Sequence, residues 1–116
     1  MDPELEKNWG RVLKFLEDKT GSPPDMQAVI FLVGAREFGI TDRKFKKDEK
    51  LNLMHIAICR LLEPYGYYVF KGNDAEGWPH YDNVKELPPL DDREQQELMK
   101  RAVVSYFLEE GIIGYG

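Results

Sequence analysis

The sequence predicts a mainly α-helical protein, with one domain of four helices in a bundle-like fold and a small β-hairpin or ordered long loop inserted between the third and fourth. Two observations predict this class. Apolar side chains recur at helical spacing in four segments, each with capping residues or prolines at its start. The stretch of about residues 64–90 lacks that spacing, yet is too long for a structureless connection in a compact domain. At 116 residues the chain has the length of one domain, predicted over residues 1–116.

The first helix is predicted to follow Asp2, which can cap it, and to end at Gly21. Pro3 suits the first turn, where its missing N–H group is harmless. The apolar positions fall on one helical stripe: Leu5, Trp9, Val12, Leu13 and Leu16. This pattern is typical of an amphipathic helix that covers a core.

The second helix is predicted over residues 23–38, because Ser22 and Asp25 have the spacing of a capping box. Its middle, AVIFLVGA, is apolar on every side, so the helix must be covered on more than one side. A short buried strand is the alternative for this stretch. Gly34 belongs to no phosphate-binding motif, and close helix packing explains it better.

A basic linker is expected at about residues 41–50, and the third helix after it, with Asp48 as a cap and with Pro64 and Gly66 as stops. Its main stripe is Leu51, Met54, Ile58, Leu61, Leu62 and Tyr65. Leu53 and Ile56 form a second patch on the opposite face, so the helix should be sandwiched. Cys59 lies within this apolar pattern and is predicted to be a buried, unreactive thiol.

Residues 67–71, YYVFK, are predicted to form a strand from their aromatic and β-branched content. The stretch WPHYDNV could return as an irregular partner, confined to a sheet edge by Pro79. Asp91 and Glu94 then supply a cap for the fourth helix. The second half of that helix, AVVSYFL, is apolar on nearly every side, and an apolar tail follows it.

The net charge of −5 and the pI of about 5.1 oppose the positive field on which nucleic-acid binding usually depends. Residues 43–50 are a local basic exception, more typical of a solvated linker, and nucleic-acid binding is not expected. The longest uncharged run has ten residues, about half of what a membrane-spanning helix needs. With one cysteine and no visible export signal, we expect a cytoplasmic protein without membrane contact.

The stretch KGNDAEGWPHYDN, residues 71–83, is the main candidate site. It holds four side chains of the kinds that bind zinc, manganese or iron: Asp74, Glu76, His80 and Asp82. Their spacing matches neither the calcium loop nor HExxH. The simpler interpretation is a turn built by glycine, asparagine and aspartate, with aromatic rings packed on the helices. We therefore expect no cofactor, and a divalent metal is the alternative.

His55 of the third helix could meet His80 or Glu76 across the fold, although a histidine on an apolar stripe is more often a structural residue. An enzyme or ligand-binding protein would bring these side chains together in a pocket. In the simpler interpretation they would point separately to solvent. The positions of these residues therefore distinguish the two hypotheses.

Catalytic motifs are missing, whereas apolar helical surface exceeds what a chain of this size easily hides. We therefore expect a non-catalytic protein–protein interaction or assembly domain that acts as a homodimer, rather than an enzyme. Aromatic residues are the expected partner-binding positions: Trp78, Tyr81, Tyr68, Phe107 and Phe31. The alternative is a small metal-dependent hydrolase or ligand-binding protein that uses the loop carboxylates and His80.

Overall fold

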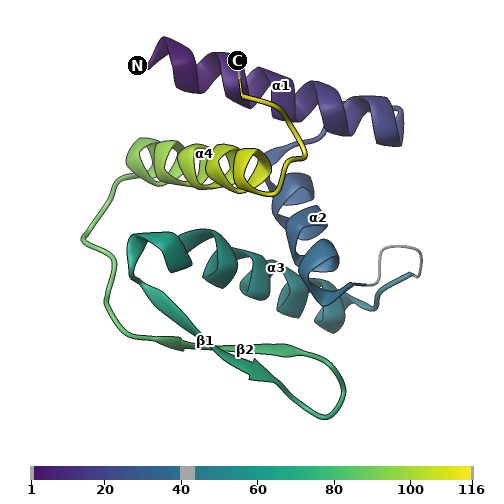
Figure 1. The fold of residues 1–116 in the computed structure, drawn as a ribbon, viewed down its shortest axis with the longest axis vertical. Coiled ribbons are helices and arrows are strands. Elements are labelled where there is room, and N and C mark those ends of the chain that lie inside the picture. Colours follow the sequence, from purple (N-terminus) through teal and green to yellow (C-terminus); the bar gives the residue numbers. More distant parts are fainter. Residues whose placement is uncertain (1, 40–43, 116) are drawn as a thin grey trace. The chain divides into compact units, whose positions relative to one another are not determined.

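The computed structural model describes residues 2–39 and 44–115, and 62% of the chain is helical. Figure 1 shows its elements, which in chain order are α1 (Pro3–Thr20), α2 (Met26–Phe38), α3 (Lys47–Leu62), the short 3₁₀ helix η1 (Glu63–Tyr65), β1 (Tyr68–Asn73), β2 (Pro79–Asn83) and α4 (Asp92–Glu109). Four helices with a two-stranded hairpin between the third and fourth confirm the predicted mainly helical class. The bundle arrangement stays a prediction.

The chain divides into two compact units. We call residues 1–25 and 89–116 the helical unit, and Met26–Pro88 the hairpin unit. In sequence the hairpin unit is an insertion in the helical unit. A pair of prolines lies close to each of the two boundaries between the units: Pro23 with Pro24, and Pro88 with Pro89. The predicted single domain over residues 1–116 stays a prediction.

The start and end of α1 follow the predicted caps. Asp2 accepts a hydrogen bond from the Glu4 amide at 3.0 Å, and Gly21 ends the helix with a φ of 81°. A positive φ is a conformation that glycine adopts without steric cost. Four residues of the predicted stripe are buried: Leu5, Trp9, Val12 and Leu16. Local sequence chemistry therefore determines both the length of α1 and its buried face.

The predicted cap of α4 is also confirmed. The Asp91 carboxylate accepts from the Glu94 amide at 2.8 Å, and the Glu94 carboxylate accepts from the Asp91 amide at 3.2 Å. This reciprocal pair satisfies two N–H groups that a helix start leaves without partners. The apolar second half of α4 is buried at Ala102, Val103, Val104, Tyr106 and Phe107.

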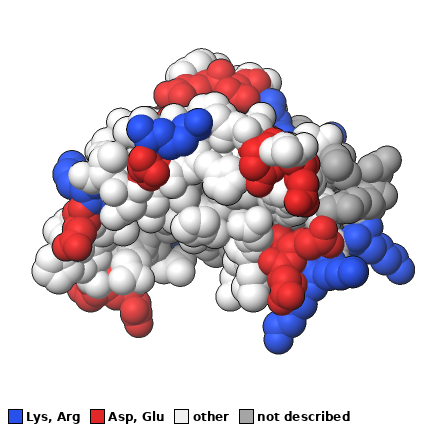
Figure 2. All heavy atoms as spheres, turned by 90° about the horizontal axis from the view of Figure 1, so that it is seen from below, with Lys and Arg blue, Asp and Glu red and all other residues white. Residues whose placement is uncertain are grey.

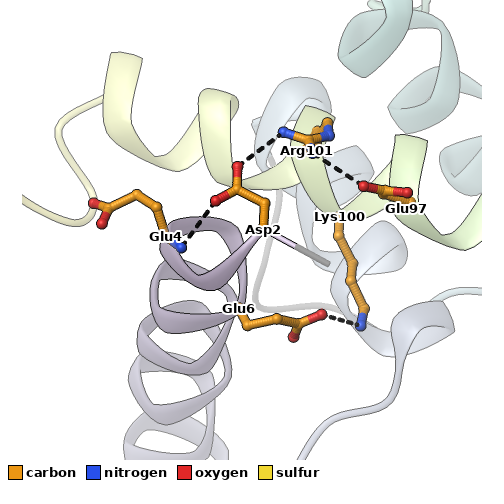
Figure 3. Close-up of polar contacts among 6 residues, drawn as sticks. All are labelled: Asp2, Glu4, Glu6, Glu97, Lys100 and Arg101. Carbon is orange, nitrogen blue, oxygen red and sulfur yellow. Dashed lines mark hydrogen bonds and ion pairs between the residues drawn. The ribbon is translucent and has the colours of Figure 1, made fainter.

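Ion pairs and aromatic contacts join α1 to α4 inside the helical unit. Figure 3 shows Lys100 reaching Glu6, with Nζ 3.3 Å from Oε1, and Arg101 reaching Asp2, with Nη1 3.4 Å from Oδ2. Farther along both helices the rings of Phe15 and Phe107 meet edge to face, 6.2 Å apart. Because the start of α1 meets the middle of α4 and a later residue of α1 meets a later residue of α4, the two helices run in the same general direction.

In the hairpin unit α2 begins at Met26, so the predicted start at residue 23 is wrong. Pro24 disfavours helical geometry at the residue before it, Pro23, where the helix was predicted to start. The AVIFLVGA stretch lies entirely within α2, so the strand alternative is also wrong. Gly34 lies against α3: an added Cβ would collide with the backbone carbonyl oxygen of Leu53. Close helix packing at Gly34 is thus confirmed.

The buried residues of α3 match the predicted pattern only in part. Leu61 and Leu62 of the main stripe are 1% exposed, and Leu53 and Ile56 of the second patch are at most 2% exposed. Leu51 of the main stripe, in contrast, is 59% exposed. The reason is tertiary: the close contact at Gly34 brings α2 against Leu53. The predicted cap at Asp48 is wrong as well, since Lys46 is the capping position and its amide donates to Glu49 Oε1 at 3.0 Å.

Only part of the predicted basic linker is a linker. Residues 41–43 lie outside the described part of the chain, residues 44–46 are non-helical, and α3 begins at Lys47. Phe45 is buried with Ala35 and Leu53 in a small apolar cluster. The segment is therefore anchored to the hairpin unit by its aromatic residue.

The hairpin pairs β1 and β2 in antiparallel register, with Val69 opposite Asp82 and Phe70 opposite Tyr81. A bulge at Lys71 shifts the register before Gly72 pairs with His80. This confirms a strand at the predicted YYVFK position, with the return strand beginning at Pro79.

The predicted excess of apolar surface on the helices is not found. Among the described residues of α2, α3 and α4, Leu51 is the one exposed large apolar side chain. Four others lie in the hairpin and the segment after it: Val69, Phe70, Val84 and Leu87. Tyr65 and Tyr115 complete the exposed set in the described residues. Searched over the described residues, the chain has no helix with the length and apolar character needed to cross a membrane.

Candidate functional site

A cleft of about 310 Å³ lies in the hairpin unit, between α3 and the hairpin. The helix contributes Asn52, His55 and Ile56 to its wall. The hairpin and its turn contribute Asp74, Glu76, Trp78, Pro79, His80 and Tyr81. Both histidines of the chain therefore line one cleft, together with two carboxylates.

Asp74 organises the turn of the hairpin. Its Oδ1 atom accepts from the backbone amides of Glu76 at 2.9 Å and Trp78 at 3.0 Å, while Oδ2 lies 2.9 Å from His80 Nε2. The His80 contact, followed by the Trp78 amide, lowers the pKa of Asp74. Because one carboxylate holds the turn and the imidazole together, Asp74 and His80 form a positioned pair at the edge of the cleft.

The Trp78 ring is fixed by α2. It stacks on Phe38 with ring centroids 4.1 Å apart and an interplanar angle of 14°. It also packs against the apolar cluster that contains Phe45 and Leu53. The turn is thus attached to the helices through an aromatic contact.

Tyr81 of β2 also lines the cleft, and its side chain is half-buried. Burial, and then the negative charges of Glu37 and Glu63, raise the pKa of Tyr81 to about 12. Its ring lies against Phe70, with centroids 5.5 Å apart. The hydroxyl therefore stays protonated at neutral pH.

The structure brings together three of the four predicted metal-binding residues. Asp74, Glu76 and His80 line the cleft, whereas Asp82 does not and instead lies 3.5 Å from Lys71 Nζ. Within the described ranges, no group of three His, Cys, Asp or Glu side chains is arranged to hold a metal ion. The metal site stays a prediction, and the geometry favours other ligands for the cleft.

His55 shares the cleft with His80 and Glu76, the meeting across the fold that the sequence suggested. It is exposed rather than part of the apolar face of α3. One turn later Cys59 is 1% exposed, with Sγ 3.6 Å from His55 Nε2. Burial raises the pKa of the Cys59 thiol to about 11, as expected for an unreactive structural thiol.

The predicted partner-binding aromatic residues lie in three environments. Trp78 and Tyr81 line the cleft, and Tyr68 and Phe31 are half-buried in β1 and α2. Phe107 is only 3% exposed and packs on Phe15 inside the helical unit. Phe107 thus offers no surface to a partner in this structure.

Sequence reasoning missed Asn52 of the cleft and the exposed pair Val69 and Val84. The alternation of side chains along a strand would have indicated the pair, because a two-stranded sheet leaves one of its faces open to water. Asn52 gave no such signal, since it reaches the cleft only through the packing of the hairpin on α3.

Four exposed lysines are described in and beside the basic segment: Lys44, Lys46, Lys47 and Lys50. Figure 2 shows one face of the molecule, on which positive and negative side chains are interspersed.

Comparisons of this chain with protein-family models, with curated proteins and with solved structures found no match. The function of this chain must therefore be inferred from the geometry within each unit.

Proposed function

We propose that this protein is a non-catalytic protein–protein interaction module that acts as a homodimer through the outer face of its hairpin. We define this face by Tyr67, Val69, Asp82 and Val84. The Val84 amide donates to the Tyr67 carbonyl oxygen at 3.0 Å, and Val69 is paired with Asp82. Because alternate residues of a strand share a face, these four side chains lie together.

The observation that carries the proposal is the exposure of two β-branched side chains on this face. Val69 is 42% exposed and Val84 is 56% exposed. Covering apolar surface stabilises an assembly by about 25 cal/mol per Å². Oppositely charged groups border the patch, because Lys71 lies 3.5 Å from Asp82. Such groups can pair across a two-fold axis, where each patch meets its own copy.

The strand edges are less suitable for association than the face. The Phe70 amide, on the edge of β1, donates to Glu63 Oε2 at 3.3 Å. Pro79 begins β2 and has no N–H group to offer. Since both edges are partly blocked in this way, a partner strand would gain few backbone hydrogen bonds.

Light scattering after size-exclusion chromatography tests the proposal. The wild-type chain should elute with twice its 13.5 kDa mass. A variant with Val69→Thr and Val84→Thr keeps the β-branching of both residues, and it should shift toward the monomer. Leu51→Gln is the matched control, since Leu51 is exposed in the same unit but on α3. A wild-type monomer at the highest soluble concentration would refute the proposal, as would equal effects of the two variants.

A further inference from the structure

We infer that the cleft between α3 and the hairpin binds a small organic molecule that carries a guanidinium group. The inference is independent of the proposed dimer, because Val69 and Val84 do not line the cleft. It depends on the size of the cleft, the contacts that hold its walls and the chemistry of its lining.

The cleft has the size and the preorganisation of a ligand site. Its volume of about 310 Å³ lies at the lower end of the range for small-molecule pockets. One wall belongs to α3 and therefore to a regular helix. The other is held by the stacking of Trp78 on Phe38 and by the hydrogen bonds to Asp74. A ligand would enter a site whose walls are already ordered, which reduces the entropic cost of binding.

The charge of the lining selects a cation. Two of the nine lining residues are carboxylates, and none is lysine or arginine. The pKa of Asp74 is lowered, so its carboxylate remains negative in mildly acidic solution. No cation of the described residues forms an ion pair with Glu76. The Glu76 carboxylate, which His80 does not hold, would disfavour an anionic ligand.

The remaining lining residues favour a flat, delocalised cation over a compact one. Trp78 and Tyr81 provide aromatic surface, on which a guanidinium group stacks better than an ammonium group. The Asn52 amide oxygen and the carboxylates supply acceptors for its five N–H donors. A bare metal ion would require three ligating side chains close together, an arrangement that the described residues lack.

NMR titration of the full chain provides the test. The probes are N-acetyl-arginine methylamide and N-acetyl-citrulline methylamide, which have nearly the same shape but differ in charge. The arginine probe should produce saturable shifts at the Trp78 indole and at the rings of His55 and His80. The citrulline probe should not. Equal shifts with both probes, or no saturable shift with the arginine probe, would overturn the inference.

Variants locate the charge that matters. Glu76→Gln should weaken binding of the arginine probe roughly fivefold to tenfold, because a partly exposed charge-assisted hydrogen bond is lost. Glu86→Gln is the matched control: it removes an exposed carboxylate of the same unit that does not line the cleft, and binding should be unchanged. If Glu86→Gln weakens binding as much as Glu76→Gln, the overall charge of the protein explains both effects and the site is refuted.

Discussion

Gly34 of α2 rests directly on the backbone of Leu53 of α3. A Cβ atom added to Gly34 would lie 2.6 Å from the Leu53 carbonyl carbon and 3.1 Å from its Cβ. The backbone φ of Gly34 is not positive, so the glycine is required by proximity rather than by conformation. The two helices of the hairpin unit therefore meet backbone to backbone at this position.

Gly34→Ala should destabilise the protein by about 2 kcal/mol, since overpacking costs roughly 1–3 kcal/mol and a backbone carbonyl cannot rotate away as a side chain can. The gain in helix propensity offsets only part of this cost. Chemical denaturation measures the change. Gly10→Ala is the matched control, because nothing lies within 4 Å of the added methyl group in α1. It should stabilise by about 0.5–1 kcal/mol, and equal effects of the two variants would contradict the close contact.

Asp74 should make the hairpin turn sensitive to acid. Its pKa is lowered in the folded state from an ordinary value of 3.8. The contribution to stability is therefore fully present above that ordinary value and is lost as the pH falls through the folded pKa. The Trp78 indole NMR signal, followed from neutral pH to pH 2, should report this loss. Asp74→Asn should remove this step, and an unchanged profile would contradict the role of the carboxylate.

Cys59 should resist alkylation in the folded protein. Burial leaves it 1% exposed and raises its pKa from 9.0 to about 11, so the thiolate population at pH 8 falls about a hundredfold. Mass spectrometry after brief iodoacetamide treatment should find unmodified protein. The same treatment in denaturant should give complete labelling. Rapid labelling of the folded chain would show that the α3 face opens.

Phe107→Ala should destabilise the helical unit by about 3–5 kcal/mol, because a buried ring is replaced by a cavity. The ring is 3% exposed and contacts Phe15. Thermal unfolding followed by circular dichroism measures the loss. Tyr115→Ala, at a residue that is 79% exposed, should change stability by less than about 0.5 kcal/mol. Similar losses in both variants would contradict this packing.

Elements governed by neighbours in sequence could be predicted from the sequence. Asp2, Gly21 and the Asp91–Glu94 pair act on amides or turns within a few residues, so their spacing alone indicates where α1 and α4 begin or end. The hairpin was predictable for the same reason. The exposure of Leu51 on α3 could not be predicted, because the burial pattern of this helix depends on the contact between Gly34 and Leu53, which are far apart in sequence.

The candidate site was partly predictable. The concentration of polar residues between Asp74 and His80 indicated the turn, and the contact between these two side chains needs only the hairpin to form. Asp82 was grouped with them although it lies outside the cleft, where it pairs with Lys71 beside the bulge. Whether His55 of α3 lines the same cleft as His80 depends on how the hairpin packs on α3, and the spacing in sequence does not determine this packing.

The insertion of one unit into the other imposes an order on folding during synthesis. The hairpin unit is continuous in sequence, whereas the pairing of Glu6 with Lys100 spans 94 residues. At a translation rate of about 5–20 residues per second, roughly 5–20 s pass between the synthesis of α1 and that of α4. During that interval the apolar stripe of α1 lacks the helix that will cover it. The hairpin unit, in contrast, has all of its own residues by the time Pro88 is made.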